Sequence, residues 1–489
     1  MLPDNALLDI FDFYKEEPGS DLFDGLSWTW KILTQVCQRW RYIVLGSPRR
    51  LDLRVVCTEN TPTRMSLDIW PPFPICVMCL PLRPEADENG VEDIVAALKH
   101  HDRISDIHIT GVHGSALEKV VAAMQEPFPT LRSFILQVVG EAAGSVPVLP
   151  ETFLGGSAPH LRSFYLHGIP FPRLVLPATC ITELRLTSIP RSVYISPDAM
   201  VTCLATLPNL ECLSIGFRSR RSRPLQISPP PLTRTVLPAL IHLRFSGVSQ
   251  YLEDFIARID APLLNQLIVT FLLDLILDID IPRLCNFIDR TECQRPFNQA
   301  KIRFSSAPIR MILGSKSPTR FELENQCGRP DWQLLLMTEI FSQHLSLLSH
   351  VEHLQIDESR WDGIGWRDDP EVPVGSSRWL ELFQLFIAVQ SLHVSQNMVP
   401  HVAAALRELS LMGEMAMEVL PALRNLSLEG LEASGPVQKA IESFVTARQL
   451  SDCPVTIQDW AYHPPFPLFL HLPSNISAQR HGCRTPYLA

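Results

Sequence analysis

The residues with the clearest chemical potential are two cysteines in the pattern Cys76-x-x-Cys79. Thiolates at this spacing bind zinc when two further ligands lie nearby, and His100 and His101 follow at a workable distance. The histidines, however, fit the solvated end of a helix. A redox-active cysteine pair would instead lie at the N-terminus of a helix. The cysteines instead stand in an apolar, strand-like run that ends before Pro81. We therefore expect structural thiols, with no metal and no cofactor.

Asp278 and Asp280 would share one face of a strand, an arrangement that suits acid–base chemistry or cation binding. With Asp274 they belong to the most apolar window of the chain, residues 263–281. This window is too charged for a membrane span and predicts buried strands with carboxylates at their solvent edge. The fifteen histidines are dispersed, and neither a G-x-S-x-G elbow nor a P-loop occurs. We therefore expect a protein without catalytic residues.

A basic run, RSRRSRP from Arg218 to Pro224, precedes a cluster of prolines. A solvated basic loop is the ordinary interpretation of Arg218–Arg223, although arginine clusters also pair with acidic or phosphorylated partners. The formal net charge of the chain is −10, which argues against broad nucleic-acid binding. We therefore expect no nucleic-acid partner.

The elements that must position such residues follow a recurring pattern, apolar-x-x-apolar-x-apolar, with shared prefixes such as PTLRSFIL and PHLRSFYL. Its spacing varies from 17 residues (Val389 to Leu406) to 38 residues (Val351 to Val389), and the pattern blurs between Ile281 and Pro330. Each instance predicts a short strand. The instances begin at Ile104, Leu131, Leu161, Ile181, Leu210, Leu240, Leu264, Val351, Val389, Leu406 and Leu423.

Amphipathic segments such as VEDIVAALKHH and YLEDFIARI fill many of the gaps and predict helices. One helix and one strand cannot bury an apolar face alone, so such units stack, with parallel strands backed by helices. The pattern resembles the leucine-rich repeat family, although the Asn or Cys that usually follows the strand is absent. An irregular solenoid is therefore expected, and a non-repeat α/β domain is the alternative.

The first fifty residues predict two amphipathic helices separated by a loop, Lys15–Gly25. Two short helices bury little apolar surface, yet this segment is rich in aromatic residues. We expect a module that completes its core on a partner or on the rest of the chain, with an ordinary helical cap as the alternative. The apolar positions are Leu7, Ile10, Phe11 and Tyr14 in the first helix and Leu33, Val36, Cys37, Trp40 and Val44 in the second.

The order of these residues, Leu2-Pro3-x-x-x-Leu7-Leu8-x-Ile10-Phe11 and then Val36-Cys37-Gln38-Arg39-Trp40-Arg41, resembles the F-box of the fungal-type F-box family. The resemblance covers about a tenth of the chain, and the long acidic gap between its halves departs from the family pattern. It implies a small helical bundle that docks on the Skp-type adaptor of a cullin-based ubiquitin ligase. The adaptor-facing residues that it implies are Leu2, Pro3, Leu7, Leu8, Ile10, Phe11, Val36, Cys37 and Trp40.

The composition fits a core-forming protein, because 46% of the 489 residues are hydrophobic and 19% are charged. The 42 prolines, against 22 glycines, predict many short elements. No basic segment followed by an apolar run marks a secretory signal. The twelve cysteines are therefore expected to be reduced core residues of a protein in the cytoplasm or nucleus, with no membrane partner.

The sequence thus predicts an α/β protein in four parts: a helical F-box-like module (1–50), a connector (51–90), an irregular leucine-rich-repeat-like solenoid (91–434), and a capping helix with a Pro-rich tail (435–489). By resemblance, it would be the substrate-receptor subunit of an SCF-type ubiquitin ligase, holding an unknown protein substrate for protein ubiquitination. The first alternative is a non-catalytic solenoid scaffold for protein interactions unrelated to ubiquitin. The second is an enzyme with an unrecognised site.

Overall fold

The computed structural model shows an α/β protein with mostly parallel strands. The chain divides into two compact units, Met1–Leu264 (unit 1) and Asn265–Ala489 (unit 2). The structure describes residues 2–15, 29–47, 51, 54–58, 67, 73–79, 88–111, 114–138, 149–150, 152–169, 179–190, 195–218, 233–272, 281–291, 296–305, 308–315, 319–327, 330–358, 375–412, 418–430 and 435–459.

Unit 1 begins with a helical module of α1 (Asp4–Lys15), α2 (Thr29–Val36) and α3 (Gln38–Gly46). The single helix predicted from Leu33 to Val44 is wrong, because Cys37 adopts an extended conformation and separates α2 from α3. The Cys37 Sγ atom accepts a hydrogen bond of 3.4 Å from the Trp40 backbone N–H and so caps α3. Of the predicted loop from Lys15 to Gly25, only Lys15 lies within the described residues.

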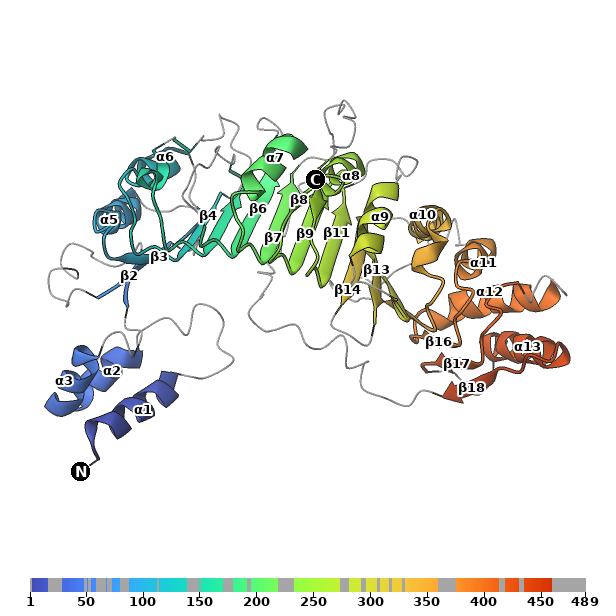
Figure 1. Ribbon diagram of the computed structural model, residues 1–489. Helices are drawn as coiled ribbons and strands as arrows, with labels where there is room; N and C mark the ends of the chain where they lie inside the picture. Colours follow the sequence, from blue (N-terminus) through green and yellow to red (C-terminus); the bar gives the residue numbers. More distant parts are fainter. Residues whose placement is uncertain are drawn as a thin grey trace, which may run out of the picture. The chain divides into compact units, whose positions relative to one another are not determined.

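The main sheet of unit 1 is parallel in every pair of neighbouring strands (Figure 1). Each strand pairs with the next strand of this sheet along the chain, which confirms the predicted parallel arrangement in this unit. The strands are β1 (Val55–Thr58), β2 (Ile75–Cys79), β3 (Ile104–Thr110), β4 (Ser133–Gln137), β5 (Ser163–His167), β6 (Glu183–Ile189), β7 (Cys212–Phe217) and β9 (His242–Gly247). The short strands β8 (Thr235–Val236) and β10 (Ile259–Asp260) form a separate parallel pair.

The helices of this part are α5 (Glu88–Leu98), α6 (Gly114–Ala122), α7 (Pro197–Leu204) and α8 (Ser249–Ile256), with a 3-10 turn, η1 (Phe153–Gly156). They cover one face of the sheet, because alternate strand residues are buried and need apolar partners (Figure 1). Phe134 of β4 and Phe164 of β5 share a register position and stack with ring centroids 5.3 Å apart. The core of unit 1 therefore lies between strands and helices.

Unit 2 contains strands in the order β11-β14-β13-β12-β15-β16-β17-β18. Strand β13 is antiparallel to both of its neighbours, and the other pairs are parallel. The strands are β11 (Gln266–Phe271), β12 (Gln299–Phe304), β13 (Pro308–Gly314), β14 (Arg320–Gln326), β15 (His353–Glu358), β16 (Ser391–Val394), β17 (Asn425–Leu428) and β18 (Thr456–Asp459). The segment in which the repeat pattern blurs thus forms a meander, β12–β13–β14, preceded by α9 (Pro282–Arg290).

The remaining helices of unit 2 are α10 (Pro330–Ser342), α11 (Ser376–Gln384), α12 (Val399–Leu411) and α13 (Pro436–Leu450), with a 3-10 turn, η4 (Leu345–Leu347). The strand predicted from Leu406 to Leu411 is wrong, because these residues end α12. The buried side chains of Val402, Leu406 and Leu409 are four and three residues apart, which is the spacing of one helical face. The helix predicted from Gly435 to Leu450 is confirmed as α13.

The coarse prediction of an α/β fold with mostly parallel strands is confirmed, and the leucine-rich-repeat-like solenoid stays a prediction. None of the helices formed by described residues combines the length and the apolar character needed to cross a membrane. The Pro-rich tail lies beyond residue 459 and outside the described part of the chain.

Candidate interaction surfaces

The two cysteines with metal-ligand spacing lie in β2, and both are buried. Burial, aided by the nearby Asp106 carboxylate, raises the pKa of Cys76 to about 12, so this thiol stays protonated at neutral pH and is a weak metal ligand. His101 lies elsewhere in unit 1, where its Nδ1 atom is 2.8 Å from the Pro127 carbonyl oxygen. Across the ranges that the structure describes, His, Cys, Asp and Glu form no group of three or more that could hold a metal.

Two other candidates from the sequence fall largely outside the described residues. Asp278 and Asp280 belong to residues 273–280, and the basic run is described only at Arg218. Two surfaces are formed by described side chains: one on the helical module of unit 1 and one on the strands of unit 2.

The helical module divides the nine predicted adaptor-facing residues into two groups. Leu7, Leu8 and Phe11 are buried, and the Phe11 ring meets the half-buried Trp40 ring edge to face, with centroids 4.8 Å apart. These four side chains therefore support the packing of α1 against α3. The exposed group consists of Leu2, Pro3, Ile10, Val36 and Cys37. Contact of any of the nine with an adaptor stays a prediction.

Polar side chains hold the module's helices in place. The Arg39 guanidinium donates hydrogen bonds of 2.6 Å to the Asp4 carboxylate and to the Leu2 carbonyl oxygen, which ties α3 to the start of α1. The Arg41 Nε atom donates a hydrogen bond of 3.0 Å to the Thr34 carbonyl oxygen and ties α3 to α2. The arginines of the F-box-like stretch thus position the helices that carry the exposed apolar residues.

Ile32 and Tyr42 are exposed apolar residues of the module that lie outside the apolar faces and the adaptor-facing residues predicted from the sequence. Ile32 is 53% exposed and stands one turn before Val36 on the same face of α2, and Tyr42 of α3 is 80% exposed. The spacing from Ile32 to Val36 could have revealed the first of them. We call Leu2, Ile10, Ile32, Val36 and Tyr42 the apolar residues of the module surface. Exposed large apolar side chains in one small module are typical of a protein–protein contact.

The second surface is formed by the alternate side chains of β12, β15, β16, β17 and β18 that do not enter the core, which we call the strand face. Parallel register aligns these side chains in rows across the strands. One row contains Gln299, His353, Ser391, Asn425 and Thr456, and the next contains Lys301, Gln355, His393, Ser427 and Gln458.

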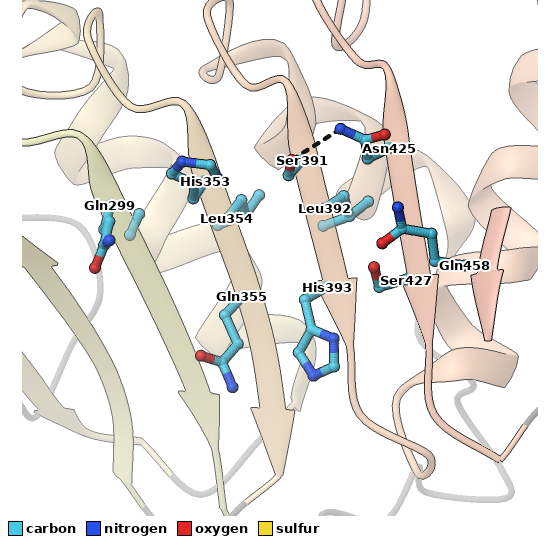
Figure 2. A pocket seen from close by; sticks show the side chains of 11 residues that line it. Gln299, His353, Leu354, Gln355, Ser391, Leu392, His393, Asn425, Ser427 and Gln458 are labelled. Carbon is cyan, nitrogen blue, oxygen red and sulfur yellow. Dashed lines mark hydrogen bonds between the residues drawn. The ribbon is translucent and has the colours of Figure 1, made fainter. Parts of the chain in front are cut away.

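A pocket of about 250 Å³ lies on this strand face (Figure 2). Eight of its eleven lining residues carry an amide, a hydroxyl or an imidazole, but most of the exposed lining surface is apolar. The Asn425 amide donates a hydrogen bond of 3.4 Å to the Ser391 hydroxyl. Gln355 and His393 occupy paired positions on β15 and β16 and lie side by side in Figure 2. The lining therefore combines apolar surface with hydrogen-bonding groups, as a face that binds an extended peptide does.

Charged side chains continue the strand face toward β14. The buried Lys301 ammonium forms an ion pair with Asp357, and the Gln355 amide donates to the same carboxylate at 3.0 Å. On the meander, Arg310 pairs with Glu322 at 2.9 Å and with Glu324 at 2.6 Å. These pairs fix the carboxylates of the face in a network.

His393 is a titratable group at which we expect unit 2 to respond to acid. Burial lowers its pKa below the ordinary value of 6.5, although Glu429, whose Oε1 atom lies 3.3 Å from His393 Nε2, opposes the shift. The unfolded chain therefore binds this proton more tightly, so the contribution of His393 to stability is present above about pH 6.5 and is lost as the pH falls through the folded-state pKa.

We expect the urea midpoint of unit 2 to fall between about pH 7.5 and about pH 5.5, and to fall less in His393→Asn. Burial also lowers the pKa values of His108 and His167, which belong to unit 1, so the midpoint of unit 1 should fall equally in the wild type and the variant. An equal fall of the unit 2 midpoint in both proteins would contradict the assignment to His393.

No protein-family model matches the chain, and no curated protein matches its sequence significantly. The function must therefore be argued from the two surfaces.

Proposed function

We propose that the chain is the substrate-receptor subunit of a cullin-based, SCF-type ubiquitin ligase. The observation that carries the proposal is the helical module, whose F-box-like residues order α1–α3 while Ile10, Ile32 and Val36 stay exposed. Covering such apolar side chains with a partner removes them from water, which favours binding. The F-box resemblance points to a Skp-type adaptor as that partner.

The strand face supports the receptor half of the proposal. Parallel strands that follow one another along the chain, backed by helices, fit an irregular leucine-rich-repeat-like solenoid interrupted by the β12–β14 meander. A solenoid of this kind presents a broad strand-lined face to a protein substrate. The chain would act by proximity, because holding the substrate on the ligase raises its local concentration near the ubiquitin-charged enzyme.

Replacing Ile32 and Val36 of α2 by glutamate tests the adaptor contact at two exposed positions outside the core of the module. Each apolar anchor of an interface is commonly worth about 2 kcal/mol, so the double variant loses about 4 kcal/mol and is expected to bind a Skp-type adaptor about 1,000-fold more weakly. The measurement is co-purification with the co-expressed adaptor, followed by titration.

A matched control replaces two exposed leucines of unit 2, Leu411 (79% exposed) and Leu450 (84% exposed), by glutamate. This variant adds the same charge and should bind the adaptor as the wild type does. Equal adaptor binding by the wild type and by the folded Ile32→Glu, Val36→Glu variant would refute the proposal.

The alternative is a non-catalytic scaffold unrelated to ubiquitin, and it draws on the fact that every lining residue of the pocket belongs to unit 2. The two functions differ when residues 1–50 are deleted. The ligase receptor then loses its adaptor but keeps its other ligands, whereas the scaffold loses no ligase component, because it has none.

A further inference from the structure

Arg303 occupies an unusual electrostatic position on the strand face. It is half-buried near the end of β12, and register places it beside Arg310 on β13 and beside Asp357 on β15. Facing side chains on neighbouring strands approach to within about 5 Å, so Arg310 repels the Arg303 guanidinium and Asp357 attracts it. Burial and this repulsion both act to lower the pKa of Arg303.

The carboxylates around Arg303 are already bonded to other cations. Asp357 pairs with Lys301 and accepts from Gln355. On the meander, Glu324 pairs with Arg310, while Glu322 is shared between Arg310 and Arg320. Among the described residues, the Arg303 side chain has no ion pair within 4.0 Å and no hydrogen bond of its own. It is therefore a surplus cation in an otherwise paired network.

A half-buried guanidinium without a carboxylate loses hydration and regains little of it from the protein, so an incoming anion would be favoured there. The flanking carboxylates limit what that anion can be. Asp357 lies beside Arg303 on β15, and Glu324 lies one strand beyond Arg310 on the other side, so both would repel a phosphate dianion. No second unpaired cation is described beside Arg303 to offset that repulsion. A single carboxylate matches the single surplus charge.

The rest of the strand face determines which residues of a bound peptide would lie beside its carboxylate. From β12 the face continues over β15, β16, β17 and β18, where no pocket residue is Asp, Glu, Lys or Arg. Four strand spacings cover about 19 Å, which an extended peptide spans with about six residues. A peptide with its carboxylate at β12 would therefore lay uncharged residues over the pocket.

We propose that the strand face of unit 2 binds an extended peptide with one Asp or Glu side chain, held by Arg303, next to an uncharged segment that fills the pocket over β15–β18. The inference rests on the proposed function for the role of this face as the substrate surface, and it names the class of segment that the substrate carries there.

The experiment uses the full-length chain and a display library of random peptides of about twelve residues. Peptides selected on the wild type are expected to carry one acidic residue at a fixed position beside uncharged residues. In synthetic copies, replacing that residue by Gln or Asn should weaken binding about 10- to 100-fold, and Arg303→Gln should weaken the acidic peptide equally. The peptide with Gln or Asn in place of the acidic residue should bind Arg303→Gln and the wild type alike, because both substitutions remove the same contact between the carboxylate and Arg303.

Arg303→Lys, which keeps the charge, should retain part of the affinity, and Lys439→Gln, on the exposed face of α13, should retain all of it. Failure to select any peptide, selection without an acidic residue, or equal binding by Arg303→Gln would overturn the inference. Tighter binding of a phosphoserine peptide at the acidic position would overturn the assignment to a carboxylate.

The two proposals fail separately in these assays. Arg303→Gln should bind the Skp-type adaptor normally, and the Ile32→Glu, Val36→Glu variant should bind the selected peptide normally. Peptide binding that depends on Arg303 without any adaptor binding would remove the ligase and leave the peptide site. Adaptor binding with no selected peptide would remove the peptide site and leave the ligase.

Discussion

Replacing Phe11 by alanine is expected to unfold the helical module. Phe11 is fully buried, and its ring packs edge to face on the Trp40 ring with centroids 4.8 Å apart. It is therefore the main apolar contact described between α1 and α3, beside the Arg39–Asp4 ion pair. Removing a buried phenylalanine costs about 3–5 kcal/mol. A module of three short helices has about that much stability to lose, because it buries little apolar surface.

Hydrogen exchange resolved along the chain measures this effect directly. Amides of α1–α3 should lose protection in Phe11→Ala, while amides of β15–β17 should keep theirs, since they belong to a different unit. The exposed Ile10 provides the matched control, because Ile10→Ala removes an apolar side chain of similar size from the same helix without leaving a cavity. Retained protection in Phe11→Ala would show that the module does not depend on this contact.

Replacing Lys301 by methionine is expected to destabilise unit 2 by up to about 3–5 kcal/mol, the cost of breaking a buried ion pair. The Lys301 side chain is 6% exposed and its partner Asp357 is 17% exposed, so the substitution leaves a largely buried carboxylate with the hydrogen bonds from Gln355 and the attraction of the neighbouring Arg303 guanidinium. Guanidinium denaturation gives the change as a lower midpoint with an unchanged slope.

Two further variants assign this loss to the unpaired charge. Lys301→Met combined with Asp357→Asn removes both charges and should recover most of the lost stability, whereas Arg303→Met should be neutral or slightly stabilising, because Arg303 makes no ion pair among the described residues. A double variant no more stable than Lys301→Met would contradict the account.

Most of the fold follows from local periodicity. Ten of the eleven predicted strand segments contain strands. The pattern is visible in the sequence because helices cover one face of the sheet, so each strand buries every second residue. Leu406–Leu411 is the exception, since three apolar positions in six residues fit a helical face as well as a strand. The β12–β14 meander was missed because only three and five residues separate its successive strands, too few for a helix, so the combined helix–strand pattern disappears there.

The candidate surfaces were harder to predict than the fold. The F-box-like order of residues points to the module, but periodicity alone does not separate Phe11, which is buried, from Ile10, which is exposed. On the strand face, Lys301 and Asp357 are 56 positions apart in the sequence and meet only through the register of β12 with β15. Arg303 is distinguished by which neighbouring carboxylates are already paired, and that information exists only in three dimensions.

Calorimetric titration of the purified full-length chain with a purified Skp-type adaptor tests the central claim most directly. The account predicts a one-to-one complex with a dissociation constant below about 1 μM, as expected for an interface built on several apolar anchors. It also predicts that Ile32→Glu with Val36→Glu abolishes the heat of binding while Leu411→Glu with Leu450→Glu leaves it unchanged. Absence of binding between the folded wild-type chain and a folded adaptor would contradict the account.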